Sequence, residues 1–125
     1  MRAFRVRGRL NQDVSIRFKA YQWFGRINCN AIGFTGARSI GRMVVKPKRK
    51  NFIYLDLSEG SLSVYAVNGN LTYLLADQSI HGEITQPLPV GNYQIRIIGK
   101  DAQFHLDAQF HLVVSKNLHT FKPMT

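Results

Sequence analysis

Short runs of alternating apolar and polar residues recur along this chain, with turn-forming residues between them. The runs are rich in β-branched and aromatic residues, and no segment has a sustained helical period. Successive side chains of a β-strand point to opposite faces, so this alternation predicts strands with one buried face. Turn signals roughly every eight to twelve residues are typical of β-sandwiches and β-barrels. The sequence therefore predicts an all-β protein.

Length and composition fit a single domain of this class. The chain has 125 residues, the size of an ordinary domain, and its 45% of hydrophobic residues are sufficient for one core. No apolar run approaches the ~18 residues of a membrane-spanning helix. We expect a single-domain antiparallel β-sandwich of about seven or eight strands over residues 1–115, with an open β-barrel as the alternative. Residues 116–125 are expected to form a loosely ordered tail.

The first two alternating runs are predicted to pair as a hairpin with one apolar and one basic face. Residues 4–10 place apolar side chains on one face and three arginines on the other. Residues 14–23 alternate in the same way after the turn-forming residues at 11–13. The apolar face of this second run carries Val14, Ile16, Phe18 and Ala20.

The same pattern predicts the strands that follow. From 25 to 50 glycines interrupt the alternation, and only 43–45 is expected to form a short strand. Strands are expected at 52–57 and 62–67, separated by a turn at 58–61. The dipeptide Asn68-Gly69 predicts a type I′ hairpin leading to a return strand. Prolines at 87 and 89 indicate a connection, after which a strand is expected at 93–98.

The hexapeptide Asp-Ala-Gln-Phe-His-Leu occurs twice in succession over residues 101–112. Because six is an even number, equivalent residues of the two copies share one face of a strand. We therefore expect one long final strand, bent near Asp107. Its inward side chains are predicted to be Phe104, Leu106, Ala108, Phe110, Leu112 and Val114, and its outward ones Gln103, His105, Asp107, Gln109 and His111.

Positive charge is concentrated in the first part of the chain. Residues 1–50 contain 13 basic residues and one acid, whereas residues 51–125 contain four basic and six acidic residues. If the first two runs pair, their basic side chains lie ~5 Å apart across the strands and ~7 Å apart along them. Like charges at this spacing repel and do not help folding, so a polyanion or an acidic surface is the expected partner. A solvated basic face is the alternative interpretation.

The candidate site is a polyanion-binding surface with two aromatic side chains beside it. Arginine makes bidentate contacts with phosphate, and aromatic rings next to basic residues are typical of surfaces on which single-stranded bases stack. Tyr21 and Trp23 are the predicted stacking residues. The predicted polyanion-binding residues are Arg5, Arg7, Arg9, Arg17, Lys19, Lys46, Lys48, Arg49 and Lys50.

Three functions without catalysis fit this surface. The first is a binding module that docks its basic face on nucleic acid or on an acidic protein surface. The second is a structural or assembly subunit of a viral particle, secretion machine or surface appendage, with possible homo-oligomers and edge strands that contact neighbouring subunits. The third is a carbohydrate-binding module that uses Tyr21 and Trp23.

The sequence gives no catalytic motif with useful specificity, so we expect no enzyme, no cofactor and no metal. His105, Asp107 and His111 share a predicted strand face, but His111 lies ~13 Å beyond Asp107 along a straight strand. We expect these three to be a solvated polar face. Cys29 is expected to be a buried core residue. A single cysteine and the lack of an apolar leader segment favour a location inside the cell or inside an assembled particle.

Overall fold

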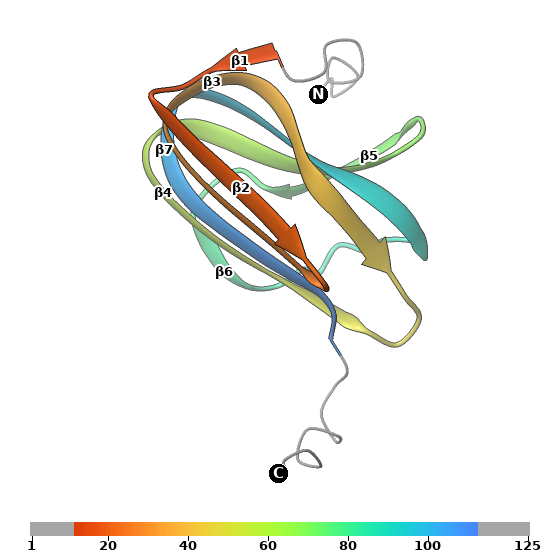
Figure 1. Ribbon diagram of the computed structural model, residues 1–125. Helices are drawn as coiled ribbons and strands as arrows, with labels where there is room; N and C mark the ends of the chain where they lie inside the picture. Colours follow the sequence, from red (N-terminus) through yellow and green to blue (C-terminus); the bar gives the residue numbers. More distant parts are fainter. Residues whose placement is uncertain (1–11, 113–125) are drawn as a thin grey trace.

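The computed structural model describes residues 12–112, which form one antiparallel sheet of seven strands (Figure 1). The central strand order is β1-β3-β7-β4-β5, while β2 pairs with β3 and β6 pairs with β4. The described residues contain no helix, and the sheet does not close into a barrel, so the all-β prediction is confirmed as a sandwich-like fold. The strands are β1 Gln12–Val14, β2 Arg17–Trp23, β3 Arg26–Val45, β4 Lys50–Asn68, β5 Leu71–Ala76, β6 Ile80–Glu83 and β7 Gly91–Leu112.

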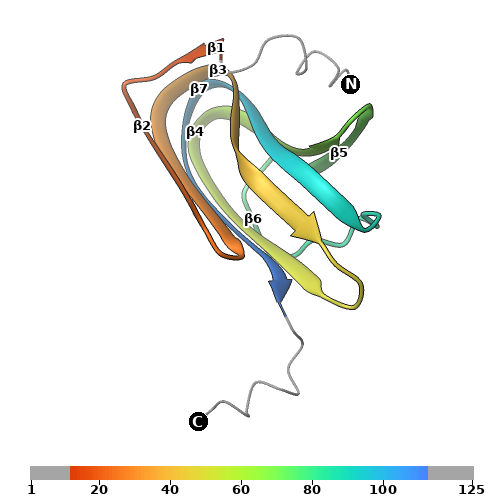
Figure 2. The same cartoon turned by 45° about the vertical axis from the view of Figure 1, so that its right-hand side comes forward.

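The sheet curls so that its two halves face each other (Figure 2). The long strands β3, β4 and β7 run through both halves. We call one half the β2 half, which contains β2, β6, residues 26–32 of β3, 50–57 of β4 and 102–112 of β7. We call the other the β5 half, which contains β1, β5, residues 35–45 of β3, 61–68 of β4 and 91–99 of β7.

Bulges in the long strands produce this curl. The pairing register of β3 shifts around Gly33 and Gly36, and that of β4 shifts around residues 57–61. Extra residues of this kind bend a strand and increase its twist. At the bend of β4, Gly60 has a φ of 74°, and a Cβ there would lie 2.2 Å from the carbonyl oxygen of Asp101 in β7. Only glycine allows the two strands to cross this closely.

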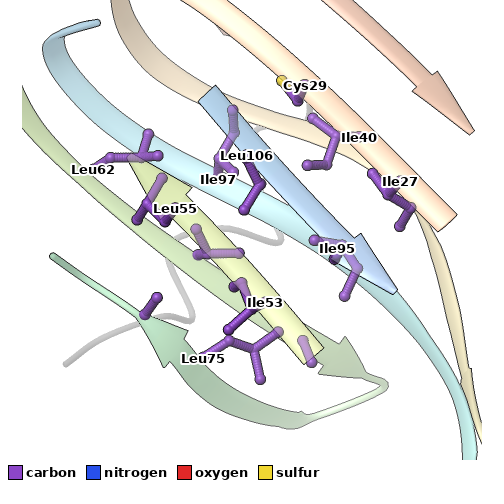
Figure 3. Close-up of a cluster of buried hydrophobic side chains, with 14 of the residues drawn as sticks. Ile27, Cys29, Ile40, Ile53, Leu55, Leu62, Leu75, Ile95, Ile97 and Leu106 are labelled. Atoms are coloured by element: carbon purple, nitrogen blue, oxygen red, sulfur yellow. The ribbon is translucent and has the colours of Figure 1, made fainter. Parts of the chain in front are cut away.

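The hydrophobic core lies between the two halves (Figure 3). Cys29, Leu55 and Leu106 enter it from the β2 half, and Leu62, Ile95 and Ile97 enter it from the β5 half; each is at most 2% exposed. The predicted inward positions from Phe104 to Phe110 are confirmed, since all four are buried. Cys29 is confirmed as a core residue, and burial raises the pKa of its thiol to about 12.

The Asn68-Gly69 hairpin is confirmed, with its turn one residue later than predicted. Asn68 pairs with Leu71, so Gly69 and Asn70 form the loop, and Gly69 has a φ of 59°. Asn68 does not have the positive φ that a type I′ turn at 68–69 would require. The return strand and the connection through the prolines are also confirmed.

Several other strand predictions were wrong because glycines that looked like strand breaks are bulges. Residues 26–45, where the alternation weakens, form one strand, and the turn predicted at 58–61 is the bulged middle of β4. The bend expected near Asp107 lies instead near Asp101, whose φ is 49°. The strand β6 was not predicted at all.

The predicted apolar face of residues 14–20 is only partly buried. Phe18 packs against the core, where the Arg38 guanidinium from the β5 half lies 4.4 Å above its ring. Val14 and Ile16 are 68% and 82% exposed, because they lie at the edge of the curled sheet. The strand β2 pairs with β3, to which it is joined by a tight turn at Phe24-Gly25. The partner predicted at 4–10 lies outside the described residues.

Some predictions lie outside the described residues. They are the strand at 4–10 with Arg5, Arg7 and Arg9, the hairpin that this strand would form, Val114, and the tail at 116–125. The side chains of His111 and Leu112 are also not described.

Candidate binding face

The outer surface of the β2 half gathers polar and aromatic side chains from five strands, and we call it the β2 face. Residues directly opposite each other in an antiparallel pair point to the same side of a sheet, so the register defines rows across this face. The rows are Lys19, Asn30, His105 and Asp56; then Tyr21, Asn28, Asp107, Tyr54 and His81; then Trp23, Arg26, Gln109, Phe52 and Glu83.

Tyr21 and Trp23 form an exposed aromatic pair on β2, as their parity predicts. The two residues are 53% and 51% exposed, and their ring centroids lie 6.3 Å apart in an edge-to-face arrangement. Two residues with the same parity lie on one side of a strand, which explains why the rings meet. The aromatic pair is therefore accessible to a ligand.

An arginine from β3 supports this aromatic pair. The Arg26 guanidinium lies 5.7 Å from the centroid of the Trp23 ring. It donates two hydrogen bonds to the Asp107 carboxylate, at 3.0 Å from Nε and 2.6 Å from Nη2. Asp107 raises the pKa of Arg26 through these hydrogen bonds and its charge. The bidentate pair fixes the guanidinium, which in turn positions the Trp23 ring.

A groove of about 420 Å³ lies beside the aromatic pair, between β2, β3, β4 and β7. Arg17 and Lys19 line one side of it, and neither has an ion-pair partner among residues 12–112. The Nδ1–H of His105 donates to the Asn30 side chain within the groove. The remaining polar lining is Asp56, Ser58 and Gln103.

A second hollow, of about 510 Å³, continues the face toward β6. Tyr54 lies between two imidazoles, with ring centroids 4.8 Å from His81 and 6.0 Å from His105. Asp107 and Gln109 complete its polar lining. The β2 face therefore offers rings and hydrogen-bonding groups on both sides of the Arg26–Asp107 pair.

The structure brings together only part of the predicted site. Arg17, Lys19, Tyr21 and Trp23 share the β2 face, and the acids Asp56, Asp107 and Glu83 are interleaved with its basic side chains. This part of the surface carries both signs of charge, unlike the all-basic face that alternation within 14–23 indicates.

The predicted basic residues at 46–50 lie elsewhere. They lie in the connection between β3 and β4 and at the first residue of β4, and they line a separate hollow of about 310 Å³ with Glu83 and Gln86. Lys50 pairs with Glu83 at 3.5 Å. Lys50 lies opposite Leu112, whereas Arg17 lies near Gln103, nine residues away along β7. That separation is about 30 Å, so the two basic groups do not form one patch.

Sequence reasoning missed the residues that β3, β4 and β6 contribute. Asn28 and Asn30 could have been found, because Arg26, Asn28 and Asn30 alternate with buried residues in the first part of β3. Tyr54, Asp56 and His81 reach the face through pairing between strands distant in sequence, which no local pattern reveals.

The described residues contain no group of three metal-ligating side chains. His105 is hydrogen-bonded to Asn30, and Asp107 is hydrogen-bonded to Arg26. Within residues 12–112 we also find no helix with the length and apolar character needed to cross a membrane. No protein family matches this chain, and comparisons with curated proteins and with solved structures find no significant match.

Proposed function

We propose that this protein is a non-enzymatic binding module that binds single-stranded nucleic acid on the β2 face. The observation that carries this proposal is the half-exposed pair of Tyr21 and Trp23 on the same side of β2 as Arg17 and Lys19, two cations with no ion-pair partner among the described residues. Stacking supplies affinity for bases of any sequence, and cations follow the phosphates.

A single strand suits this face better than a duplex. Exposed rings contact bases only when the bases are unstacked from their own helix. Asp56, Asp107 and Glu83 balance the charges of Arg17, Lys19 and Arg26 on this face, whereas the phosphates of a duplex alone require a strongly basic surface. Rings, amides and two free cations are therefore a better match for splayed nucleotides.

Trp23 is the only tryptophan in the chain, so its fluorescence reports on the proposed site directly. Titration with a short oligothymidylate should quench this fluorescence, and binding should weaken as salt rises. Each phosphate contact with a single strand contributes about 0.7 to the slope of log affinity against log salt. The double variant Arg17→Gln, Lys19→Gln should therefore reduce that slope by about 1.4.

Lys100→Gln is the matched control, because Lys100 is exposed and lies outside the β2 face. It should leave the salt slope unchanged. A salt-independent affinity, or a slope that the double variant does not alter, would overturn the nucleic-acid proposal. Quenching by neutral oligosaccharides with no salt dependence would assign the face to carbohydrate instead.

A structural or assembly subunit is the second candidate, favoured by exposed apolar side chains around β1 and β2. Val14, Ile16 and Phe24 are 68%, 82% and 90% exposed, which is unusual for large apolar residues that lie close together in one chain segment. Size-exclusion chromatography with light scattering should then show oligomers that Ile16→Ser dissociates. A monomer at the highest attainable concentration would rule out this candidate.

A further inference from the structure

The β5 half buries a charged side chain on its outer side. Arg96 of β7 is 1% exposed and is the largest fully buried side chain in the described part of the chain. It lies opposite Ser39 and Tyr65, while its neighbours Ile95 and Ile97 point to the core. Arg96 therefore lies on the side of the sheet away from the core, and it is buried there nonetheless.

Most of the hydrogen-bonding capacity of Arg96 is unused. Its Nη1 donates to Gln94 Oε1 at 3.4 Å, whereas Nε and Nη2 are buried and have no hydrogen-bond partner within residues 12–112. Burial lowers the pKa of Arg96, but a guanidinium stays protonated in proteins. A buried cation with unmade hydrogen bonds is among the costlier arrangements in a folded protein.

None of the acidic side chains of the chain pairs with this arginine. All seven acidic residues lie within residues 12–112. Asp13, Asp107 and Glu83 are paired with Arg38, Arg26 and Lys50, and none of the seven forms a salt bridge with Arg96. Residues 1–11 and 113–125 contain no aspartate or glutamate that could reach it.

A polar pocket lies beside Arg96. It has a volume of about 390 Å³ and is lined by Arg42, Asn68, Asn92 and Gln94 together with Arg96. Arg42 lies directly opposite Gln94, so it is the diagonal neighbour of Arg96, ~7–8 Å away across the strands. Two long guanidinium side chains at that separation can reach one ligand.

The backbone of the second arginine, Arg42, is fixed by the side chain of Gln22. Gln22 of β2 donates from Nε2 to the Arg42 carbonyl at 2.7 Å, and the Arg42 amide donates to Gln22 Oε1 at 2.9 Å. These bonds fix the end of β3 from which the Arg42 side chain projects. The pocket thus combines a buried guanidinium, a second guanidinium on a fixed strand end and side-chain amides that can donate further hydrogen bonds.

We propose that this pocket binds an oxyanion, the phosphate or carboxylate group of a small ligand, between Arg96 and Arg42. The planar fork of a guanidinium matches two oxygens of either group. Arg96 Nε and Nη2 are covered and have no partner among the described residues, so a small rotation of the side chain toward the pocket would let them donate to the anion. The pocket has the size of a small-molecule site. This site is separate from the β2 face and does not depend on the function proposed for it.

Thermal unfolding and calorimetric titration of the full chain test this site, with inorganic phosphate and acetate as probes at constant ionic strength. At least one anion should bind saturably and raise the melting temperature, since it binds only the folded state. The anion that binds more tightly identifies the oxyanion class. Arg96→Met should abolish the effect, and Arg42→Gln should weaken binding by about tenfold or more.

Lys100→Gln is the control, because it removes the same charge at an exposed position away from the pocket. It should keep the anion response of the natural sequence. Arg42 is exposed, so Arg42→Gln tests the site even if Arg96→Met fails to fold. Absence of a saturable response to both anions, or an equal response in Arg42→Gln, would overturn the proposal.

Discussion

The two halves of the sheet share three strands but differ in the exposure and pairing of their basic side chains. On the β2 face the cations are at the surface, and Arg26 has a bidentate carboxylate partner in Asp107. On the outer side of the β5 half, Arg96 is buried, and in the described part of the chain its side chain has one long hydrogen bond, to a neutral amide. Because β3, β4 and β7 run through both halves, the difference arises from individual side chains and not from two kinds of architecture.

This contrast shows how the charge asymmetry of the sequence is resolved in three dimensions. The acids of the second part of the chain fold back onto the basic first part, since Asp107 meets Arg26 and Glu83 meets Lys50. Arg96 lies in the acidic part of the sequence, yet none of these acids forms a salt bridge with it. Local charge density along a chain is therefore a poor guide to which cation is left without a partner.

The bend that joins the halves should be the most sensitive point of the fold. Gly60→Ala would place a Cβ 2.2 Å from the Asp101 carbonyl oxygen at a φ of 74°, and we expect a loss of at least about 3 kcal/mol in the free energy of unfolding. Gly69→Ala is the control, with a φ of 59° and no atom within 4 Å, and should cost only about 1 kcal/mol. Equal losses in urea denaturation would show that the crossing is not tight.

Removing the buried arginine should stabilise the protein when no anion is bound. Replacing an unpaired buried cation with an apolar side chain of similar length is expected to raise the free energy of unfolding by about 2 kcal/mol. Arg96→Met in phosphate-free, carboxylate-free buffer tests this by urea denaturation. Arg26→Met on the β2 face should act in the opposite direction, because it leaves Asp107 without its partner. A loss of stability in both variants would remove the contrast between the halves.

The core that the halves share gives a pH-dependent prediction. Burial raises the pKa of Cys29 to about 12, while a thiol in the unfolded chain titrates near ~8.5. The folded state holds this proton more tightly than the unfolded chain. The protonated thiol therefore makes its full contribution to the free energy of unfolding below pH ~8.5, and this contribution is lost as the pH rises toward 12. By pH 10 the loss is about 2 kcal/mol.

Cys29→Ala isolates this effect, since the variant lacks the thiol but keeps every other titrating group. The difference in unfolding free energy between the natural sequence and the variant should shift by about 2 kcal/mol in favour of the variant between pH 7 and pH 10. A difference that stays constant over this range would mean that water reaches Cys29.

The sequence was informative wherever local alternation decides the structure. The parity of residues 104–110 predicts four buried side chains, and Asn68-Gly69 predicts the β4–β5 hairpin to within one residue. The parity of 17–23 also predicts that Arg17, Lys19, Tyr21 and Trp23 share a side. In each case the evidence lies within a few residues, so no knowledge of tertiary contacts is needed.

The rest depends on contacts that a local pattern does not contain. A glycine in a bulge and a glycine in a turn look alike in a sequence, so the sequence predicts a turn at Gly60, although this residue lies within a continuous strand. The Arg26–Asp107 pair joins residues 81 positions apart. Arg96 alternates with Ile95 and Ile97 as a surface residue would, and only the assembled sheet shows that it is buried.

The smallest expected effect separates binding from folding on the β2 face. Trp23 is 51% exposed, so Trp23→Ala loses mainly the contact with Arg26, worth about 0.5–1 kcal/mol at an exposed site. Binding of a dye-labelled oligothymidylate should fall much more, because one stacked base contributes about 1–3 kcal/mol, or roughly five- to 150-fold in affinity. Leu71→Ala on the opposite hairpin, at 54% exposure, is the matched control and should leave oligonucleotide affinity unchanged. An equal loss of affinity in both variants would mean that the aromatic pair has no particular role, and that the two halves do not differ in what they bind.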